Sequence, residues 1–426
     1  PGGVFIGCSH AVAGGSATHH HTHTHQPPAR TKNERLQTPT TRRHALQGGR
    51  PESSEVGGRR SDVMFQCAQH LPDADARRTA GRLIQRGVVT LRDIERVAPN
   101  LTIQSINGTA STNMYLRGDG FNDFTQSNMA PVVTYFDDVP FAYSTMASGL
   151  MFDLADATVT PGPVGTTHGQ STTGGEVRLQ TADPTDTWHY GASEDIASYA
   201  RSRSEAYVSG PIAKNLDFRL AGQTRQGGGW QTDPLNGSHL GDANSWALRG
   251  KLRWRPDSRT TIMLGGHFVQ DDSEVVTAVP VKRLIGTQAL PSLGWGQAEW
   301  SSRPQFADLI GRKRGIKPSE HNPFWGWDLH IDHDFGIAKI TSITAFETER
   351  EGEYTDQDGT AAAQADTYRT VDANVFTQEL RLSSSRPDDR LQWVVGAFYQ
   401  RSRMNQRFFF DYTDYTPARG YMMATS

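Results

Sequence analysis

Apolar and polar residues alternate in regular order from Trp188 onward. A period of two over segments of this length predicts β-strands with one apolar and one polar face. The apolar faces of six such segments are Leu216, Phe218 and Leu220; Trp246, Leu248, Leu252 and Trp254; Ile262, Leu264 and Phe268; Trp325, Trp327, Leu329 and Ile331; Phe376, Leu380 and Leu382; Leu391, Trp393, Val395 and Tyr399.

The connections between these strands alternate in length. Short turns are predicted at 211–215, 256–259, 334–337 and 385–390, and long polar segments at 225–243, 272–322 and 350–373. Short turns at one end and long loops at the other are typical of outer-membrane β-barrels. The segment around Arg249, Lys251 and Arg253 carries Trp residues at both ends of its opposite face, which favours a membrane barrel over a soluble β-sandwich.

Residues 88–185 show shorter elements separated by glycine-rich turns. The segment 88–100 predicts a short amphipathic helix, with Thr90 as N-cap and Asp93 as its acidic partner. Leu91, Ile94 and Val97 share its apolar face. Short strands are predicted at 101–105, 113–117, 132–136, 157–160 and 177–180.

The first 86 residues show neither the period of two that is typical of strands nor the period of 3.6 that is typical of helices. The first 70 contain two Phe, no Trp and no Tyr, together with both cysteines, Cys8 and Cys67. Such a segment buries too little apolar surface to offset the entropy of ordering. We therefore interpret residues 1–86 as disordered or as a non-native N-terminal segment, and the histidine run at 19–25 as part of it, without a specific metal site.

The composition further limits the classes of protein to which the chain can belong. The chain has 426 residues, of which 36% are hydrophobic and 21% charged, with 42 Gly and 22 Pro. This low apolar share and the many turn residues argue against a helical bundle. A net charge of -3 gives no indication of nucleic-acid binding.

Three features could suggest catalysis, and each has a simpler explanation. The glycine-rich segment 161–175 lacks the Gly-Lys-Ser/Thr end of a phosphate loop. His168 lies near Asp153, Asp156 and Ser171 without a nucleophile-elbow sequence, so we interpret it as a turn residue. The pair at 137–138 fits a tight turn. We expect neither an enzyme nor a metal site.

The ordered motifs of 88–185 resemble the plug domain of TonB-dependent outer-membrane receptors. The matching elements are the helix ending in APN at 98–100, YLRG at 115–118, PVVTYFDDVP at 131–140, FDL at 152–154 with TVTPGPVG at 158–165, and TGG at 173–175. Three later segments resemble early barrel strands of the family: YVSGPI at 207–212, ALRGKL at 247–252 and TQELRL at 377–382.

The chain departs from the family pattern at several positions. Asp138 stands where Gly is usual, Pro161 where Arg is frequent, and Glu176 where a small residue is usual. A TonB-box-like segment is not visible upstream. The 239 residues from 188 to 426 accommodate about ten of the roughly 22 strands of a plugged barrel. We therefore expect a fragment.

The resemblance implies a mostly β fold, in which a small α+β plug at 87–185 precedes a partial antiparallel transmembrane β-barrel at 186–426. It implies a monomeric receptor in the outer membrane of a Gram-negative bacterium, transporting a small-molecule ligand with energy from the TonB-ExbB-ExbD complex. A ferric siderophore or similar iron complex is the leading ligand, and cobalamin or a carbohydrate the alternative. A non-transporting remnant or binding protein is the other hypothesis.

The resemblance also implies candidate site residues. Arg117 of the plug is expected to pair with Glu379, which the alternation turns toward the lumen. The residues expected to contact the ligand are Phe121, Asn122, Phe124, Gln126, Asn128 and Tyr143. The glycines expected to form plug turns are Gly118, Gly162, Gly165, Gly174 and Gly175. No cofactor is expected beyond the transported chelate.

Overall fold

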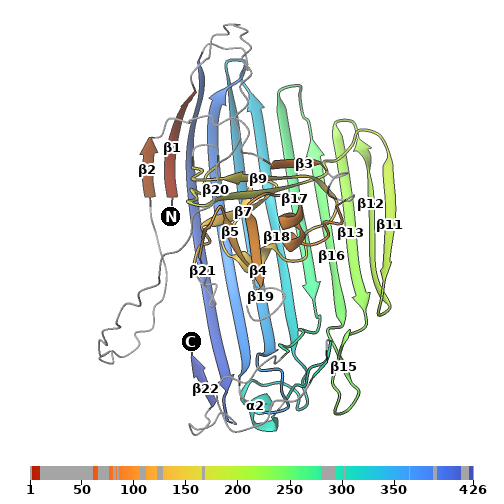
Figure 1. Ribbon diagram of the computed structural model, residues 1–426. Helices are drawn as coiled ribbons and strands as arrows, with labels where there is room; N and C mark the ends of the chain where they lie inside the picture. Colours follow the sequence, from red (N-terminus) through yellow and green to blue (C-terminus); the bar gives the residue numbers. More distant parts are fainter. Residues whose placement is uncertain are drawn as a thin grey trace, which may run out of the picture.

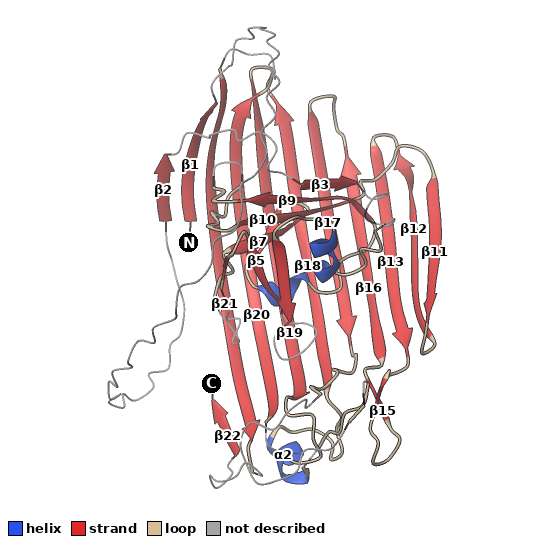
Figure 2. Cartoon of the chain, viewed as in Figure 1, coloured by secondary structure: helices blue, strands red, loops and turns tan. Residues whose placement is uncertain are grey.

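A small sheet lies against the inner face of a large curved sheet (Figures 1 and 2). The computed structural model describes residues 2–9, 61–65, 76–79, 83, 86–105, 112–121, 128–165, 168–279, 293–294, 296–301, 303–363, 365–386, 391–413 and 422–425. We call this small sheet, together with a second short sheet and the helical turns beside it, the plug, and the large sheet the barrel sheet. The predicted fold class, a small α+β plug followed by part of an antiparallel barrel, is confirmed.

In the part of the chain that the structure describes, the barrel sheet has open edges and runs as a continuous antiparallel meander from β11 to β21. Its long strands are β11 (His189–Ala197), β12 (Arg201–Ala213), β13 (Leu216–Gly227), β16 (Ala243–Trp254), β17 (Thr260–Asp271), β18 (Ser319–Asp334), β19 (Ala338–Asp356), β20 (Asp366–Ser384) and β21 (Gln392–Asp411). Beyond β21, β1 (Gly2–Ser9) and β22 (Met422–Thr425) pair with different parts of that strand, and β2 (Ser61–Phe65) pairs with β1.

The predicted alternation sorts side chains between the two faces of the barrel sheet. On β16, Trp246, Leu248 and Trp254 are exposed on the outer face, whereas Arg249 and Lys251 are buried on the inner face. An apolar outer face bounded by Trp is the surface that lipid requires. No helix in the described ranges is long and apolar enough to cross a membrane.

The predicted difference between the two ends of the sheet is also observed. One end has short turns, and the other carries β14 (Gln231–Thr232), β15 (His239–Leu240) and α2 (Pro304–Leu309). One predicted loop, 350–373, was wrong over most of its length, because β19 and β20 continue to 356 and from 366. Glu349, Glu351 and Glu353 are buried on the inner face there, so the strand lacks the apolar pattern that would have indicated it.

The plug combines two sheets with two 3-10 helices. Its strands are β3 (Ala76–Thr79), β4 (Leu101–Ser105), β5 (Thr112–Leu116), β6 (Asp119–Gly120), β7 (Val132–Phe136), β8 (Val139–Phe141), β9 (Leu154–Pro161) and β10 (Gly175–Thr181). The order β3-β9-β10-β7-β8 includes a parallel pairing of β10 with β7, and β4-β5-β6 form the second sheet. The strands predicted for this region are therefore confirmed.

The predicted helix is observed as the 3-10 helix η1 (Leu91–Arg96), and η2 (Ser144–Ala147) is the second. Asp93 Oδ2 accepts hydrogen bonds from the Thr90 N–H and Oγ1, both at 2.8 Å. Leu91, Ile94 and Val97 are buried in the plug core. The predicted cap and apolar face are both present.

Most of the predicted N-terminal segment lies outside the described residues, including the histidine run. Within it, β1 and β2 extend the barrel sheet, and β3 pairs with β9 of the plug.

The apolar outer face predicts that the cost of a charged substitution depends on its depth in the bilayer. Leu220 pairs with Gly250, midway between Trp246 and Trp254 along β16. We expect Leu220→Arg to lower the free energy of unfolding from lipid vesicles by about 2–4 kcal/mol, since it places a charge at the bilayer midplane. Thr224, which pairs with Trp246, is the control, and Thr224→Arg should cost about 0–1 kcal/mol. Equal losses in urea titrations of the two variants would contradict this orientation.

Candidate functional site

The interface between plug and barrel sheet contains buried cations on the barrel side. Arg219 of β13 and Arg249 and Lys251 of β16 are all less than a tenth exposed. They lie on the inner face because polar residues take alternate positions on these strands. A buried cation needs an anion or several acceptors to offset its desolvation, and the plug supplies both.

Asp153 of the plug binds Arg219. The Arg219 Nε–H donates to Asp153 Oδ2 at 2.7 Å, and Nη2 makes a second contact with Oδ1. Such two-point binding fixes orientation as well as charge. The Arg219 guanidinium also lies over the Tyr207 ring, 4.1 Å from its centroid. This pair joins the segment before β9 to β13.

Arg249 binds the neighbouring plug backbone rather than a carboxylate. Its Nη1 and Nη2 donate to the carbonyls of Phe152 and Leu150 at 2.8 and 2.9 Å. Its guanidinium lies 4.2 Å from the ring centroid of Phe152 and 4.6 Å from that of Phe136. Arg249 thus holds this plug segment through the backbone carbonyls of Leu150 and Phe152 and through packing on the Phe152 ring.

Lys251 binds Asp137 at the β7–β8 turn. The distance from Lys251 Nζ to Asp137 Oδ2 is 3.0 Å, and Asp183 Oδ1 is 3.6 Å away. Asp137 also accepts the Thr181 N–H at 2.8 Å and its Oγ1–H at 2.6 Å. Burial alone would raise the pKa of Asp137, but Lys251, Arg249 and the bonds from Thr181 hold the pKa below its ordinary value.

Asp138 lies in the same turn and contacts one cation of the plug and one of the barrel sheet. Both Asp137 and Asp138 have left-handed backbones, with φ of 47° and 65°, as a tight turn between twisted strands requires. Asp138 Oδ1 accepts from Arg178 at 2.5 Å and Oδ2 lies 4.0 Å from Arg381 of β20. Burial raises the pKa of Asp138, but the charges of Arg178, His168 and Arg381 outweigh it and lower the pKa.

The predicted pair of Arg117 and Glu379 is not brought together. Glu379 is buried on the inner face of β20 and contacts Arg381, with Arg381 Nε 2.9 Å from Glu379 Oε1. Its Oε2 accepts the Gly169 N–H of the plug at 3.0 Å. Arg117 is an exposed turn residue with φ of 54°. Glu379 therefore does link plug and barrel sheet, but through a plug backbone amide.

Two further plug positions lie close to the barrel strands. The Thr145 Oγ1–H donates to Glu349 Oε2 of β19 at 2.6 Å. A Cβ on Gly169 would come within 2.1 Å of the Phe398 ring and 2.8 Å of Glu379, so only glycine fits there. These contacts hold the plug on the side opposite to Arg219.

His168, interpreted as a turn residue, is buried against Glu176, with Nδ1 3.2 Å from Oε2. The adjacent Tyr135 donates from its hydroxyl to the Gln170 carbonyl at 2.8 Å. Burial, with the nearby charges of Glu176 and Glu379, raises the pKa of Tyr135 well above its usual value. The unusual Glu176 is thus a structural partner of His168.

The predicted turn glycines fall into two groups. Gly118, Gly162 and Gly175 have positive φ, at 83°, 97° and 131°. A Cβ on Gly175 would also come within 2.3 Å of the Thr160 carbonyl oxygen. Positive φ is not found at Gly165 or Gly174, where the neighbouring side chains of Ser171 and Val132 limit the space.

The predicted ligand residues that the structure describes do not line either of two cavities at this interface. Phe121 and Asn128 are exposed, and Tyr143 is buried in the plug core. The other three, Asn122, Phe124 and Gln126, lie outside the described residues.

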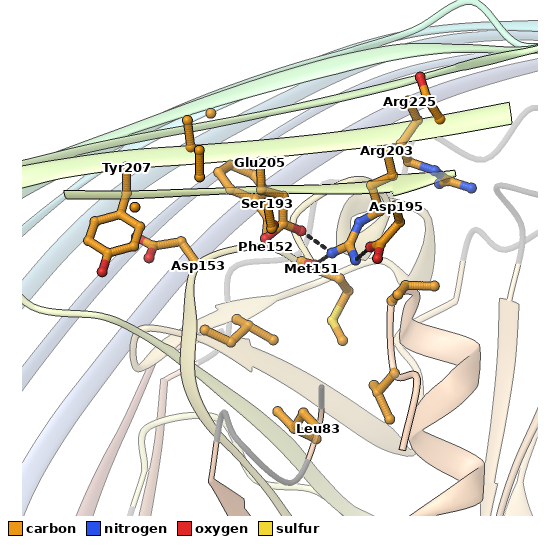
Figure 3. A pocket seen from close by; sticks show the side chains of 18 of the residues that line it. Leu83, Met151, Phe152, Asp153, Ser193, Asp195, Arg203, Glu205, Tyr207 and Arg225 are labelled. Atoms are coloured by element: carbon orange, nitrogen blue, oxygen red, sulfur yellow. Dashed lines mark hydrogen bonds and ion pairs between the residues drawn. The ribbon is translucent and has the colours of Figure 1, made fainter. Parts of the chain in front are cut away.

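The larger cavity, of about 940 Å³, lies between the plug and β11 to β13. Figure 3 shows Met151, Phe152 and Asp153 of the plug facing Arg203 and Tyr207 of β12. The second cavity, of about 300 Å³, lies toward the long loops and is lined by Arg92, Arg225, Trp230 and Glu320 among others.

Sequence reasoning missed Asp137 and Asp153 as anchors, although Arg249 and Lys251 were identified as cations of the polar face. A signal was available: buried cations on the inner face demand anions from whatever fills the lumen. The pair at 137–138 was instead explained as a tight turn, and Asp153 was given no role.

We expect Lys251→Met to destabilise the docked plug by about 3 kcal/mol, because it leaves Asp137 buried without its cation. The measurement is the rate of proteolytic cleavage within the plug of the folded chain. The double variant Lys251→Met with Asp137→Asn should recover most of the loss. Additive losses in this double-mutant cycle would show that the two residues do not interact.

Acid should weaken plug docking through Asp137 and Asp138. Because folding lowers both pKa values, their contribution is present above the unfolded pKa of about 4 and is lost as pH falls through the folded values. The midpoint of urea unfolding should therefore drop below about pH 4. A variant with Asn at both positions should show a smaller drop, and an unchanged pH profile would rule out this origin.

Comparisons with known proteins agree with this architecture. No protein-family model matches the chain. The pesticin receptors of Yersinia enterocolitica and Yersinia pestis are 30% identical over 185 residues, 42% of this chain and 27% of theirs. The chain thus covers well under two thirds of these relatives.

Solved structures match over more of the chain. The ferric yersiniabactin uptake receptor FyuA from Yersinia pestis aligns with a TM-score of 0.62 and 21% identity, over 82% of this chain and 50% of that one. The siderophore receptor PiuA from Acinetobacter baumannii aligns with a TM-score of 0.63 and 16% identity, over 83% and 48%. The chain spans about half the length of these receptors.

The ferripyoverdine receptor of the outer membrane of Pseudomonas aeruginosa also aligns, with a TM-score of 0.58 and 16% identity, over 83% of this chain and 45% of that one. The resemblance predicted from the plug motifs is confirmed, and the chain has the plug-and-barrel fold of the TonB-dependent outer-membrane receptors.

Proposed function

We propose that this chain acts in ligand-gated active transport of a small metal chelate, of the ferric-siderophore class, across the outer membrane. The observation that carries the proposal is a plug seated against the inner face of the barrel sheet by buried ion pairs, Asp153 with Arg219 and Asp137 with Lys251. A seated plug closes a pore, and its ionic contacts can be broken and remade.

The ligand would bind at the loop end of the plug. The cavity of about 300 Å³ there combines the half-buried Trp230 with the guanidinium groups of Arg92 and Arg225. An aromatic face and cations suit a chelate that is partly planar and negatively charged. The exposed Phe121 and Asn128 stay predicted ligand contacts. The structural likeness to the ferric yersiniabactin uptake receptor and to the siderophore receptor PiuA supports this choice of ligand class.

Energy would come from the TonB-ExbB-ExbD complex acting on the plug, and no step would be catalytic. The test is uptake of radioactive iron by a Gram-negative host that lacks its own siderophore receptors and expresses this chain. Uptake of one ferric chelate that disappears in a TonB-deficient host is expected. Binding without uptake would favour a non-transporting binding protein, and uptake of cobalamin or a sugar instead would correct the ligand class.

The binding cavity can be tested separately. Trp230→Ala should weaken chelate binding about five- to tenfold, because stacking on an aromatic face contributes about 1 to 1.4 kcal/mol. Quenching of intrinsic fluorescence by a panel of ferric chelates, recorded for the chain folded in detergent, measures this. Trp325→Ala, on the lipid-facing side of β18, is the matched control. A Trp230 variant with unchanged affinity would exclude this cavity as the binding site.

A further inference from the structure

Three aspartates stand side by side on three neighbouring strands at the loop end of the barrel sheet. Asp356 of β19 pairs directly with Asp366 of β20, and Asp366 pairs directly with Asp411 of β21. Directly paired residues point to the same face. All three are buried, with exposed fractions of 2%, 0% and 0%.

This arrangement is costly for a chain without a bound cation. Directly opposite positions place Cβ atoms about 5 Å apart, and like charges there repel. Each buried carboxylate also loses its hydration. Among the described residues, none of the ion pairs includes Asp356, Asp366 or Asp411.

Two oxygen atoms of this group have no partner. Asp366 Oδ1 and Asp411 Oδ2 are fully buried and receive no hydrogen bond. Asp366 Oδ2 and Asp411 Oδ1 do accept bonds, from Ser301 and Thr413. Each side chain is therefore oriented by one oxygen and presents the other, which is the arrangement of a metal ligand held in place by its neighbours.

The loop after β19 adds a fourth carboxylate. Asp356 Oδ1 accepts the N–H groups of Asp358 and Gly359, at 3.2 and 2.9 Å, and Gly359 has φ of 67°. This tight turn folds the chain back, so that carboxylate oxygens of Asp356, Asp358 and Asp366 all lie within 4.8 Å of one another.

The carboxylates also contact the segment that carries α2. Ser301 N–H donates to Asp356 Oδ2 at 3.2 Å, and Ser301 Oγ–H donates to Asp366 Oδ2 at 3.0 Å. The Tyr354 hydroxyl donates to the Ser301 carbonyl at 2.6 Å. Phe306 of α2 then packs on the Tyr354 ring, with centroids 6.0 Å apart. Figure 1 shows α2 beside the ends of these strands.

We propose that Asp356, Asp358 and Asp366 bind a calcium ion, with Asp411 as a further carboxylate ligand, and that this ion fastens the α2 segment to the ends of β19 and β20. Carboxylate ligands alone suit a hard cation. Calcium accepts six to eight oxygens in irregular geometry, whereas magnesium requires a near-ideal octahedron and keeps several waters. From the sequence we expected no metal site, and Asp356, Asp358 and Asp366 lay in the loop predicted at 350–373.

The first test is calcium binding by the full chain folded in detergent and freed of metal with EGTA. Equilibrium dialysis with radioactive calcium should show about one ion per chain, with a dissociation constant of about 10⁻⁴ to 10⁻³ M, as in other extracellular sites. Asp366→Asn and Asp411→Asn, tested separately, should each weaken binding at least tenfold. Asp334→Asn, in a turn at the opposite end of the sheet, should leave binding unchanged.

The second test reads the α2 segment directly. Lys313 and Arg314 are exposed just after α2 and offer trypsin two cleavage sites. Millimolar calcium should slow cleavage there several-fold relative to EGTA in the wild-type chain and in Asp334→Asn, but not in Asp366→Asn.

Either of two results would overturn the proposal. The first is a wild-type chain that binds no calcium and is cleaved equally fast in calcium and EGTA, which would mean that the carboxylates are protonated instead. Equal protection by magnesium at the same concentration would overturn the assignment to calcium. Because both readouts use the wild-type chain, they stand even where a variant fails to fold.

Discussion

Charge neutralisation inside the barrel sheet is the constraint on which the docked plug depends. Arg219, Arg249 and Lys251 lie on an inner face where water is displaced by the plug, and a buried cation without a partner is strongly destabilising. Asp153, Asp137 and the carbonyls around Phe152 meet that requirement. The same contacts fix the positions of β7, of β9 and of the segment before β9. The plug core is therefore positioned by side chains of β13 and β16.

The local elements could be predicted because each is encoded by neighbouring residues. The period-two pattern located the long strands and told inner from outer faces, as Leu248 and Arg249 illustrate. The cap formed by Thr90 and Asp93 and the strand at 132–136 follow from short-range chemistry in the same way. The prediction failed at 350–373, where both faces of β19 and β20 carry polar side chains and the signal of alternation vanishes.

The contacts of the site could not be predicted to the same extent, because they join residues far apart in sequence. The alternation correctly predicted that Glu379 lies on the inner face. Its plug partner is the backbone amide of Gly169, and a backbone partner cannot be identified from residue types. Of the anchoring aspartates, Asp137 had a sufficient local explanation as a turn residue, and Asp153 was noted only as a neighbour of His168 in sequence. Their role depends on which strand lies across from them, which only the packing of the plug determines.

The fit of Gly169 has a consequence for biosynthesis. Its position is enclosed by Phe398 and Glu379, residues of β20 and β21 that are synthesised more than 200 positions later. The plug is synthesised before these strands, but the contacts of Gly169 with Phe398 and Glu379 can form only after both strands have been made. This part of the plug is therefore synthesised first but reaches its final packing last, after β20 and β21 have been made.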